Sequence, residues 1–194
     1  MVMTMTNEQV LDILKQAGVL LDGHFLLTSG KHSAQYMQCA KIFSNYQYSK
    51  QLCGALAEKY ADEKPTLVVG IAMGSLLMAY EMAAQFGCKN IFAERVDNQL
   101  QFRRGFEIDK NDRILVVEDV VTTGKSTMEV MQLLKGYNVI GVGSIVDRSN
   151  GAADFGVPFK SVVTANIQTY DKDNCPLCAQ GIEVVKPGSR KITD

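Results

Sequence analysis

Two neighbouring carboxylates, Glu118 and Asp119, are the residues whose type and placement point most directly to chemistry. They follow the uninterrupted apolar run 114–117, which is typical of a parallel strand buried on both faces. A hydroxyl-rich bend comes next, and the apolar spacing after it predicts a helix. Free backbone N–H groups in such a bend, together with the dipole of the helix, favour a bound anion. The bend consists of Thr122, Thr123, Gly124, Lys125, Ser126 and Thr127.

Two other interpretations of this stretch are weaker. A nucleoside-triphosphate P-loop needs glycine five positions before the Gly-Lys pair, and this chain has Asp119 there. A generic strand-to-helix loop with N-capping threonines explains neither the paired acids nor the run of hydroxyls. A ribose 5-phosphate fits better, because it offers hydroxyls to the two carboxylates and a phosphate to the bend.

The order of two apolar residues, two acids, two apolar residues and Thr-Thr-Gly resembles the phosphoribosyl-diphosphate (PRPP) signature of type I phosphoribosyltransferases. This resemblance implies that the bend, 122–127, holds the 5-phosphate of PRPP. It also implies that Glu118 and Asp119 bind the ribose hydroxyls and favour positive charge in the ring. The Mg²⁺ cofactor is then carried on the diphosphate, near Asp119, with no direct protein ligand.

A second loop of small residues follows the buried strand predicted at 66–72. It lies at the carboxyl end of that strand, which is the edge where open α/β sheets bind ligands. By resemblance to the PRPP enzymes, its backbone amides hold the diphosphate, and small side chains permit that close approach. A plain strand-to-helix turn is the alternative. The loop residues are Ala72, Met73, Gly74 and Ser75.

Two further stretches of the sequence indicate which base the enzyme would bind. The string F-x-L-x-S-G at 25–30 resembles the N-terminal segment of orotate phosphoribosyltransferases, which forms a hood over the pyrimidine; a surface hairpin is the alternative. The resemblance places Tyr36, Met37 and Thr122 at the base. Val-Asp-Arg at the end of a later strand resembles that family's arginine for the orotate carboxylate, so Arg148 is the expected partner. A salt bridge from Arg148 to Asp147 is the competing interpretation.

A predicted hairpin at 90–108 carries three arginines, Arg95, Arg103 and Arg104. The resemblance implies a loop here that closes over PRPP, commonly across a dimer interface. The chain has no lysine or histidine between Lys89 and Lys110, and arginine cannot donate a proton near neutral pH. We therefore expect the arginines to stabilise the diphosphate. A solvated, charged hairpin is the alternative.

The tail contains one Cys-x-x-Cys pair, Cys175 and Cys178. Two cysteines supply two ligands, whereas a structural zinc site needs four, and both histidines lie far upstream in the sequence. The sequence therefore favours a plain knuckle turn over a zinc site. This tail resembles that of a subset of orotate enzymes.

Strands predicted at 67–72, 90–96, 113–118 and 139–146, with helices between several of them, indicate a mainly parallel central sheet flanked by helices. This α/β architecture agrees with the type I phosphoribosyltransferase fold. We expect a single domain, 1–194, in which residues 1–45 form a hood over the active site. The tail, 170–194, is a further candidate for the hood.

The composition narrows the function classes. A formal net charge of −1 gives no electrostatic reason for binding nucleic acid or a membrane surface, and no apolar run approaches the roughly 20 residues of a transmembrane helix. The odd number of cysteines, five, suggests reduced thiols in a cytoplasmic protein. The expected protein is a homodimeric enzyme that converts PRPP and orotate into orotidine 5′-monophosphate and diphosphate. The alternatives are an enzyme for a purine base and a non-catalytic PRPP sensor.

Overall fold

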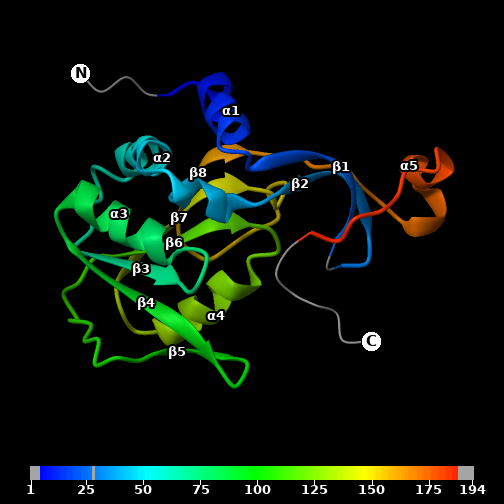
Figure 1. The fold of residues 1–194 in the computed structure, drawn as a ribbon. Coiled ribbons are helices and arrows are strands. Elements are labelled where there is room, and N and C mark those ends of the chain that lie inside the picture. Colours follow the sequence, from blue (N-terminus) through cyan, green and yellow to red (C-terminus); the bar gives the residue numbers. More distant parts are fainter. Residues whose placement is uncertain (1–4, 28, 188–194) are drawn as a thin grey trace.

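The described residues of the computed structural model, 5–27 and 29–187, form two β-sheets (Figure 1). Expectations that concern Thr28 or residues 1–4 and 188–194 lie outside the described residues. The large sheet has the strand order β5-β4-β3-β6-β7-β8. Its strands are β3 (Leu67–Ile71), β4 (Lys89–Val96), β5 (Gln99–Phe102), β6 (Ile114–Val121), β7 (Val139–Asp147) and β8 (Phe159–Thr164).

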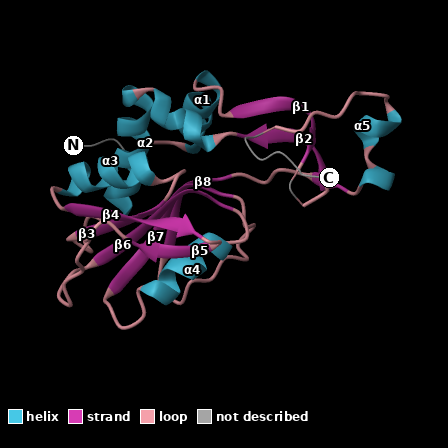
Figure 2. Ribbon diagram, turned by 60° about the horizontal axis from the view of Figure 1, so that its bottom comes forward, coloured by secondary structure: helices cyan, strands magenta, loops and turns pink. Residues whose placement is uncertain are grey.

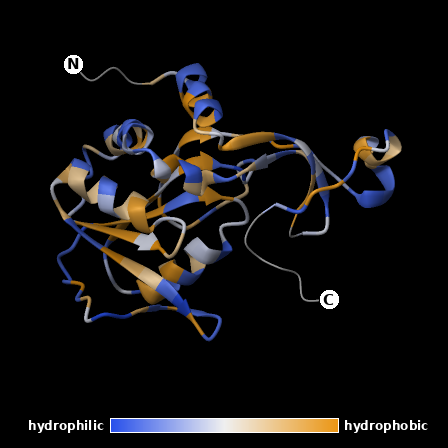
Figure 3. Ribbon diagram, viewed as in Figure 1, coloured by the Kyte–Doolittle hydropathy of each residue, from blue (hydrophilic) through white to orange (hydrophobic). Residues whose placement is uncertain are grey.

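The large sheet is parallel except for β5, which pairs antiparallel with β4 at one edge. This confirms the predicted mainly parallel α/β fold. All five residues of β3 and the first four of β6 are buried, as their unbroken apolar runs predicted. The hydropathy colouring of Figure 3 shows these strands as an apolar centre.

Helices cover both faces of the large sheet (Figure 2). Core residues of α1, α2 and α3 pack on one face, and those of α4 pack on the other. The helices are α1 (Asn7–Gln16), α2 (Tyr46–Lys59), α3 (Leu76–Phe86), α4 (Lys125–Leu133) and the short α5 (Pro176–Ala179), with 3₁₀ turns η1 (Cys39–Ser44) and η2 (Lys172–Asn174). None of the helices in the described part of the chain is long and apolar enough to cross a membrane.

Local sequence explains where these helices begin and what fixes them. Thr6 and Gln9 form the predicted capping box at the start of α1. Tyr60, fully buried just after α2, donates a hydrogen bond to the carbonyl of Val142 in β7 and accepts one from the backbone N–H of Lys160 in β8 at 3.1 Å. The Tyr60 hydroxyl therefore links the end of α2 to both β7 and β8.

The small sheet has the order β1-β2-β9, with β1 (Leu20–Leu26), β2 (His32–Met37) and β9 (Thr169–Tyr170). Residues 25–27 and 36–39 have the sequence pattern of two short strands, but the structure differs at both: β1 begins at Leu20 and β2 spans His32–Met37. A bulge between Asp22 and Phe25 interrupts the alternation that would have revealed the earlier start of β1. The tail also joins this sheet, because Val185 exchanges backbone hydrogen bonds with the other edge of β1 at 2.8 and 2.9 Å.

Candidate active site

The acid pair lies within the last four residues of β6, which continues to Val121, three positions beyond the predicted end at 118; the bend toward α4 follows. The Thr127 hydroxyl, buried in the first turn of α4, donates a hydrogen bond to the Glu118 carboxylate. The Asp119 backbone N–H donates to Ser75 Oγ, at 3.3 Å, in the loop that follows the neighbouring strand β3. The end of β6 thus connects the two loops that the sequence singled out.

Burial strongly perturbs both carboxyl groups. It raises the pKa of Glu118 to about 7; the hydrogen bond from Thr127 lowers that pKa in part, and the neighbouring Asp119 charge raises it. Burial also raises the pKa of Asp119, against backbone hydrogen bonding from Val120. Within the described residues neither acid has an ion-pair partner. The two groups are therefore suited to a ligand that supplies hydroxyl donors or a cation.

The 72–75 loop reaches its position because Gly74, and Gly70 in β3, lack side chains. A Cβ on Gly74 would lie 2.9 Å from Asp119 Oδ1, and one on Gly70 would lie 2.8 Å from the carbonyl oxygen of Ser75. A cis peptide joins Ala72 and Met73. The structure thus places this loop directly beside the acid pair.

Half of the residues of the 122–127 bend are exposed, as an anion site requires. Thr122, Thr123 and Lys125 are exposed. Gly124 has φ +70°, and a Cβ there would lie 2.9 Å from the Phe155 ring, so the turn requires glycine. No side-chain cap is made by Gly124, the residue at the N-cap of α4. Thr127 differs from its neighbours, because its hydroxyl is bonded to Glu118 and not directed to solvent.

A cavity of about 400 Å³ adjoins the acid pair. It is lined by the segment after β2, by the loop after β3 and by the end of β6. Five of the predicted site residues meet here, namely Tyr36, Met37, Met73, Gly74 and Asp119. The sequence interpretation missed the other lining residues, which are Gln38, Cys39, Ala40, Phe43, Leu77 and Val120. Their positions in the chain could have indicated them, because each of these residues is next to a predicted site residue or a few positions from one.

A larger hollow of about 700 Å³ lies between α1 and α2, and its lining includes Gln9, Gln47 and Lys50. None of the predicted site residues lines it. We therefore place the candidate active site at the smaller cavity.

Arg148 follows β7, and its backbone N–H donates to the Val121 carbonyl at 2.8 Å. Burial lowers the pKa of its guanidinium, while the nearby Cys39 and Tyr36 oppose that change. Both of these residues line the cavity, although Arg148 is not itself part of the lining. Its Nε is buried and has no hydrogen-bond partner within the described residues. Asp147 Oδ1 instead accepts from the Ser149 backbone N–H at 2.7 Å. The expected competing salt bridge to Asp147 is therefore not formed in the described structure.

The arginine hairpin is shorter than predicted and its arginines lie outside the cavity lining. Strand β5 ends at Phe102, because Arg104 and Gly105 take positive φ values of +62° and +70°. Arg95 pairs with Glu129 of α4, and Arg104 pairs with Glu94, each at 2.9 Å. The remaining arginine, Arg103, is exposed. A role for the three arginines at the diphosphate stays a prediction.

One expectation about the tail is wrong. In the sequence both histidines are far from Cys175 and Cys178, yet in the structure His24 and His32 lie beside both cysteines. The pairing of β1 with β2 brings the two histidines together, and the tail then folds onto that sheet.

Comparison with known proteins agrees with this geometry. The family model described as "Phosphoribosyl transferase domain" matches residues 41–171. An orotate phosphoribosyltransferase of Caldanaerobacter subterraneus subsp. tengcongensis is 55% identical over 190 residues, covering 97% of this chain and 100% of the relative. One from a Thermoanaerobacter species is 55% identical over 191 residues, with the same coverage.

A solved structure is also similar. The crystal structure of orotate phosphoribosyltransferase from Aeropyrum pernix superposes with a TM-score of 0.64 at 26% identity, covering 80% of this chain and 93% of that one. The resemblance first drawn from the acid pair, the bend and the hood string is therefore confirmed. The chain belongs to the phosphoribosyl transferase domain family and, within it, to the orotate phosphoribosyltransferases.

Proposed function

We propose that this protein transfers the 5-phosphoribosyl group of PRPP to orotate, which yields orotidine 5′-monophosphate and diphosphate. The observation that carries the proposal is the cavity that begins at Asp119 and ends at Tyr36. It joins a site suited to a phosphorylated sugar to the cavity residue Tyr36, which lies near the half-buried Arg148, whose Nε is an unused donor.

The sugar half of the site would bind PRPP through three elements. The amides and hydroxyls of 122–127 would hold the 5-phosphate at the N-terminus of α4. Glu118 and Asp119 would accept hydrogen bonds from the ribose hydroxyls. The backbone of 72–75, which lies against Asp119, would hold the diphosphate.

Magnesium fits this site as a partner of PRPP. Two half-buried carboxylates whose pKa values are raised, with no ion-pair partner in the described structure, favour a nearby divalent cation. Asp119, beside the 72–75 loop, would hold it through its hydration shell. The ion would neutralise charge on the departing diphosphate.

The base half would bind orotate between the small sheet and the end of β7. Arg148 offers a fork of donors that matches a carboxylate, and its unpartnered Nε is one of them. Tyr36 and Met37 line the same cavity and would contact the pyrimidine face, and Thr122 lies at the start of the bend. In this proposal the small sheet, with part of the tail, is the hood over the base.

Catalysis would rest on positioning and charge. As the bond from the anomeric carbon to diphosphate loosens, positive charge grows on the ribose and negative charge grows on the leaving group. Asp119 and Glu118 would stabilise the ribose cation. Arg95, Arg103 and Arg104 would stabilise the diphosphate after the hairpin closes, which requires the ion pairs of Arg95 and Arg104 to be exchanged. Orotate is already an anion, so a strong general base is unnecessary.

The test is diphosphate release from PRPP and Mg²⁺ in the presence of orotate, uracil, adenine or hypoxanthine, one at a time. We expect release with orotate alone. Release with a purine would select the purine enzyme, and PRPP binding without release from any base would select the sensor. A homodimer and a cytoplasmic location are further predictions that this assay leaves untouched; sedimentation velocity tests the first.

A further inference from the structure

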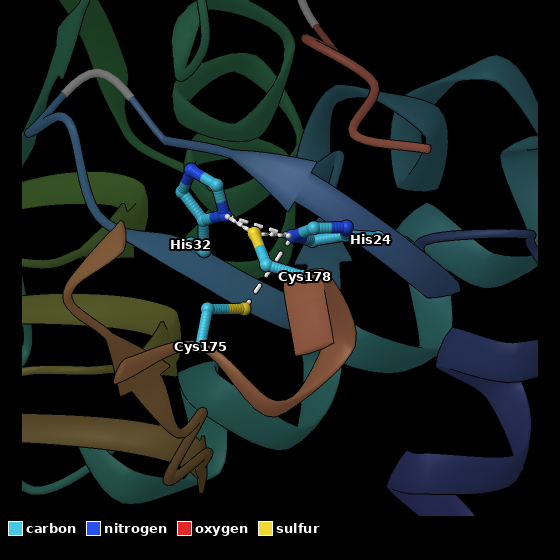
Figure 4. Close-up of side chains that lie close together, drawn as sticks. All are labelled: His24, His32, Cys175 and Cys178. Atoms are coloured by element: carbon cyan, nitrogen blue, oxygen red, sulfur yellow. Dashed lines mark hydrogen bonds between the residues drawn. The ribbon is translucent and has the colours of Figure 1, made fainter. Parts of the chain in front are cut away.

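Four side chains from opposite ends of the chain converge in the small sheet (Figure 4). His24 lies on β1 and His32 on β2, while Cys175 and Cys178 flank the start of α5 in the tail. One potential ligand atom from each residue lies within 4.8 Å of all the others. His24, His32 and Cys175 are buried and Cys178 is exposed.

The ring of His24 presents a free lone pair to the cluster. Its Nδ1 lies 2.7 Å from the Ile182 carbonyl oxygen, which can only accept a hydrogen bond. The proton therefore resides on Nδ1, and Nε2 is left with its lone pair directed at the other three residues. A carbonyl that fixes the tautomer of a histidine in this way is the usual support of a metal ligand.

Three potential ligand atoms lie close to His24 Nε2. His24 Nε2 lies 2.8 Å from His32 Nδ1, 3.5 Å from Cys175 Sγ and 3.8 Å from Cys178 Sγ. His32 Nδ1 also lies 3.3 Å from Cys178 Sγ. A single lone pair can satisfy one hydrogen bond, so a hydrogen-bonded histidine pair accounts for one of these approaches and leaves both thiols unexplained.

The spacing fits a tetrahedral ion. Zn–N bonds of about 2.0 Å and Zn–S bonds of about 2.3 Å put neighbouring ligand atoms about 3.3 to 3.8 Å apart. The sulfur-to-nitrogen distances of 3.3 to 3.8 Å match this scale. The 2.8 Å between His24 Nε2 and His32 Nδ1 is shorter, so the two rings would have to move apart to bind an ion between them. Two thiolates would also balance the charge of a divalent ion, so the complex could be buried with neutral imidazoles at no net charge.

We propose that His24, His32, Cys175 and Cys178 bind one structural Zn²⁺ that fastens the C-terminal tail to the N-terminal hairpin. Four protein ligands leave no open position, so the ion has a structural and not a catalytic role. Two nitrogen and two sulfur ligands in tetrahedral array select zinc over magnesium or calcium, which take oxygen ligands.

The small size of its apolar core gives a physical reason for a metal link in the small sheet. Its only buried apolar side chains, in the described parts of β1, β2, β9 and the Cys-x-x-Cys turn at 175–178, are Phe25, Met37 and Cys175. So small a core stabilises little, and folded units of this size commonly rely on a metal or disulfides. The ion would act together with the β2–β9 pairing and with the backbone bonds between Val185 and β1.

The first experiment measures bound metal in the full-length protein. The protein is expressed without a histidine tag, dialysed to remove loose ions and assayed by inductively coupled plasma mass spectrometry. We expect about one zinc per chain in the wild type and less than about a tenth of that in Cys175→Ser/Cys178→Ser and in His32→Ala. Cys88→Ser is the matched control, because Cys88 is a half-buried thiol outside the cluster, and it should keep its zinc.

The second experiment remains informative if a variant fails to fold. Wild-type protein is stripped with a chelator and reloaded with Co²⁺, whose visible d–d bands report tetrahedral geometry and whose near-ultraviolet bands report bound thiolate. We expect both sets of bands at one equivalent, and their loss when one equivalent of Zn²⁺ is added. Wild-type protein with no zinc, with iron in its place, or with zinc retained by the double cysteine variant would each overturn the proposal.

A kinetic measurement tests the effect of the ion on the base-binding cavity, and this test alone rests on the proposed function. Tyr36 lies four residues beyond His32 on β2, so loss of the ion should loosen the wall of the base cavity. We expect zinc removal to raise the KM for orotate at least threefold more than the KM for PRPP, with restoration by added Zn²⁺. If the metal is bound but both KM values stay equal, the ion is structural without influence on the base site, and that consequence is wrong.

Discussion

Gly74 and Asp119 lie so close together that glycine is required: a Cβ on Gly74 would meet the carboxylate oxygen Oδ1 at 2.9 Å and the carboxyl carbon at 3.3 Å. Gly74 lies in the loop that follows β3, Asp119 lies in the neighbouring parallel strand β6, and both line the candidate cavity. Their contact fixes where the buried carboxylate can point. It also ties the proposed diphosphate loop to the proposed ribose site.

Gly74→Ala is expected to lower turnover at least tenfold while the fold persists, because the methyl group must displace Asp119 or the loop. Gly54→Ala is the control. Gly54 lies within α2, where an added Cβ would approach Gln85 Oε1 no closer than 3.8 Å, so alanine should stabilise the helix by about 0.5–1 kcal/mol. Steady-state kinetics and urea unfolding of both variants measure the two effects. Full activity in Gly74→Ala would mean that Asp119 tolerates the displacement and does not act at the ribose.

Asp119→Asn removes a charge and keeps the shape of the side chain. If Asp119 stabilises positive charge on the ribose, turnover should fall at least tenfold, equivalent to about 1.4 kcal/mol of transition-state stabilisation or more. The measurement is kcat with saturating PRPP and orotate. A value within twofold of the wild type would contradict the assigned role.

Glu118 should make stability depend on pH. Its pKa is about 7 in the folded protein, against an ordinary value of 4.5, so the folded state holds the proton more tightly than the unfolded chain does. The protonated group therefore stabilises the fold fully below about pH 4.5, and this contribution is lost as pH rises to about 7 and through it.

The comparison is with Glu118→Gln, which stays neutral and can still accept a hydrogen bond from Thr127. Urea unfolding at a series of pH values should show the variant gaining stability relative to the wild type from about pH 4.5 to about pH 7, and a constant difference above that range. A difference that does not change with pH would refute the buried, proton-binding carboxyl group.

Arg148→Ala is expected to raise the KM for orotate at least tenfold, with a much smaller effect on the KM for PRPP, because in the proposed function the unpartnered Nε donates to the orotate carboxylate. Arg148→Lys keeps the charge but loses the fork of donors, so it should recover only part of the affinity. Initial-rate kinetics with each substrate varied in turn measure both values. Equal losses for the two substrates would remove Arg148 from the base site.

The chemistry of the sugar site was largely predictable from sequence because its residues are adjacent in the chain. The apolar run before Glu118 specified a buried strand, and the glycine and hydroxyls after Val121 specified a tight bend before a helix. Once strands are known to be parallel, the loops at their carboxyl ends must share one edge, so the meeting of 72–75 with Asp119 also followed. The length of the arginine hairpin predicted at 90–108 was less predictable, because β5 ends early where Arg104 and Gly105 adopt left-handed backbone conformations.

Only the tertiary structure decided which distant segments meet. The sequence indicates the secondary structure of β1, β2 and the tail, but local patterns carry no information about the partner of a strand or the register of the pair. The antiparallel pairing sets His32 opposite Leu26, and His24, in the bulge of β1, reaches His32 from two positions away. The folding of a tail about 150 positions away in the chain brings both cysteines to them. The acid pair is thus encoded locally, whereas the histidine–cysteine cluster and the approach of Arg148 to Tyr36 arise from long-range packing, whose free energy depends on contacts that no single stretch contains.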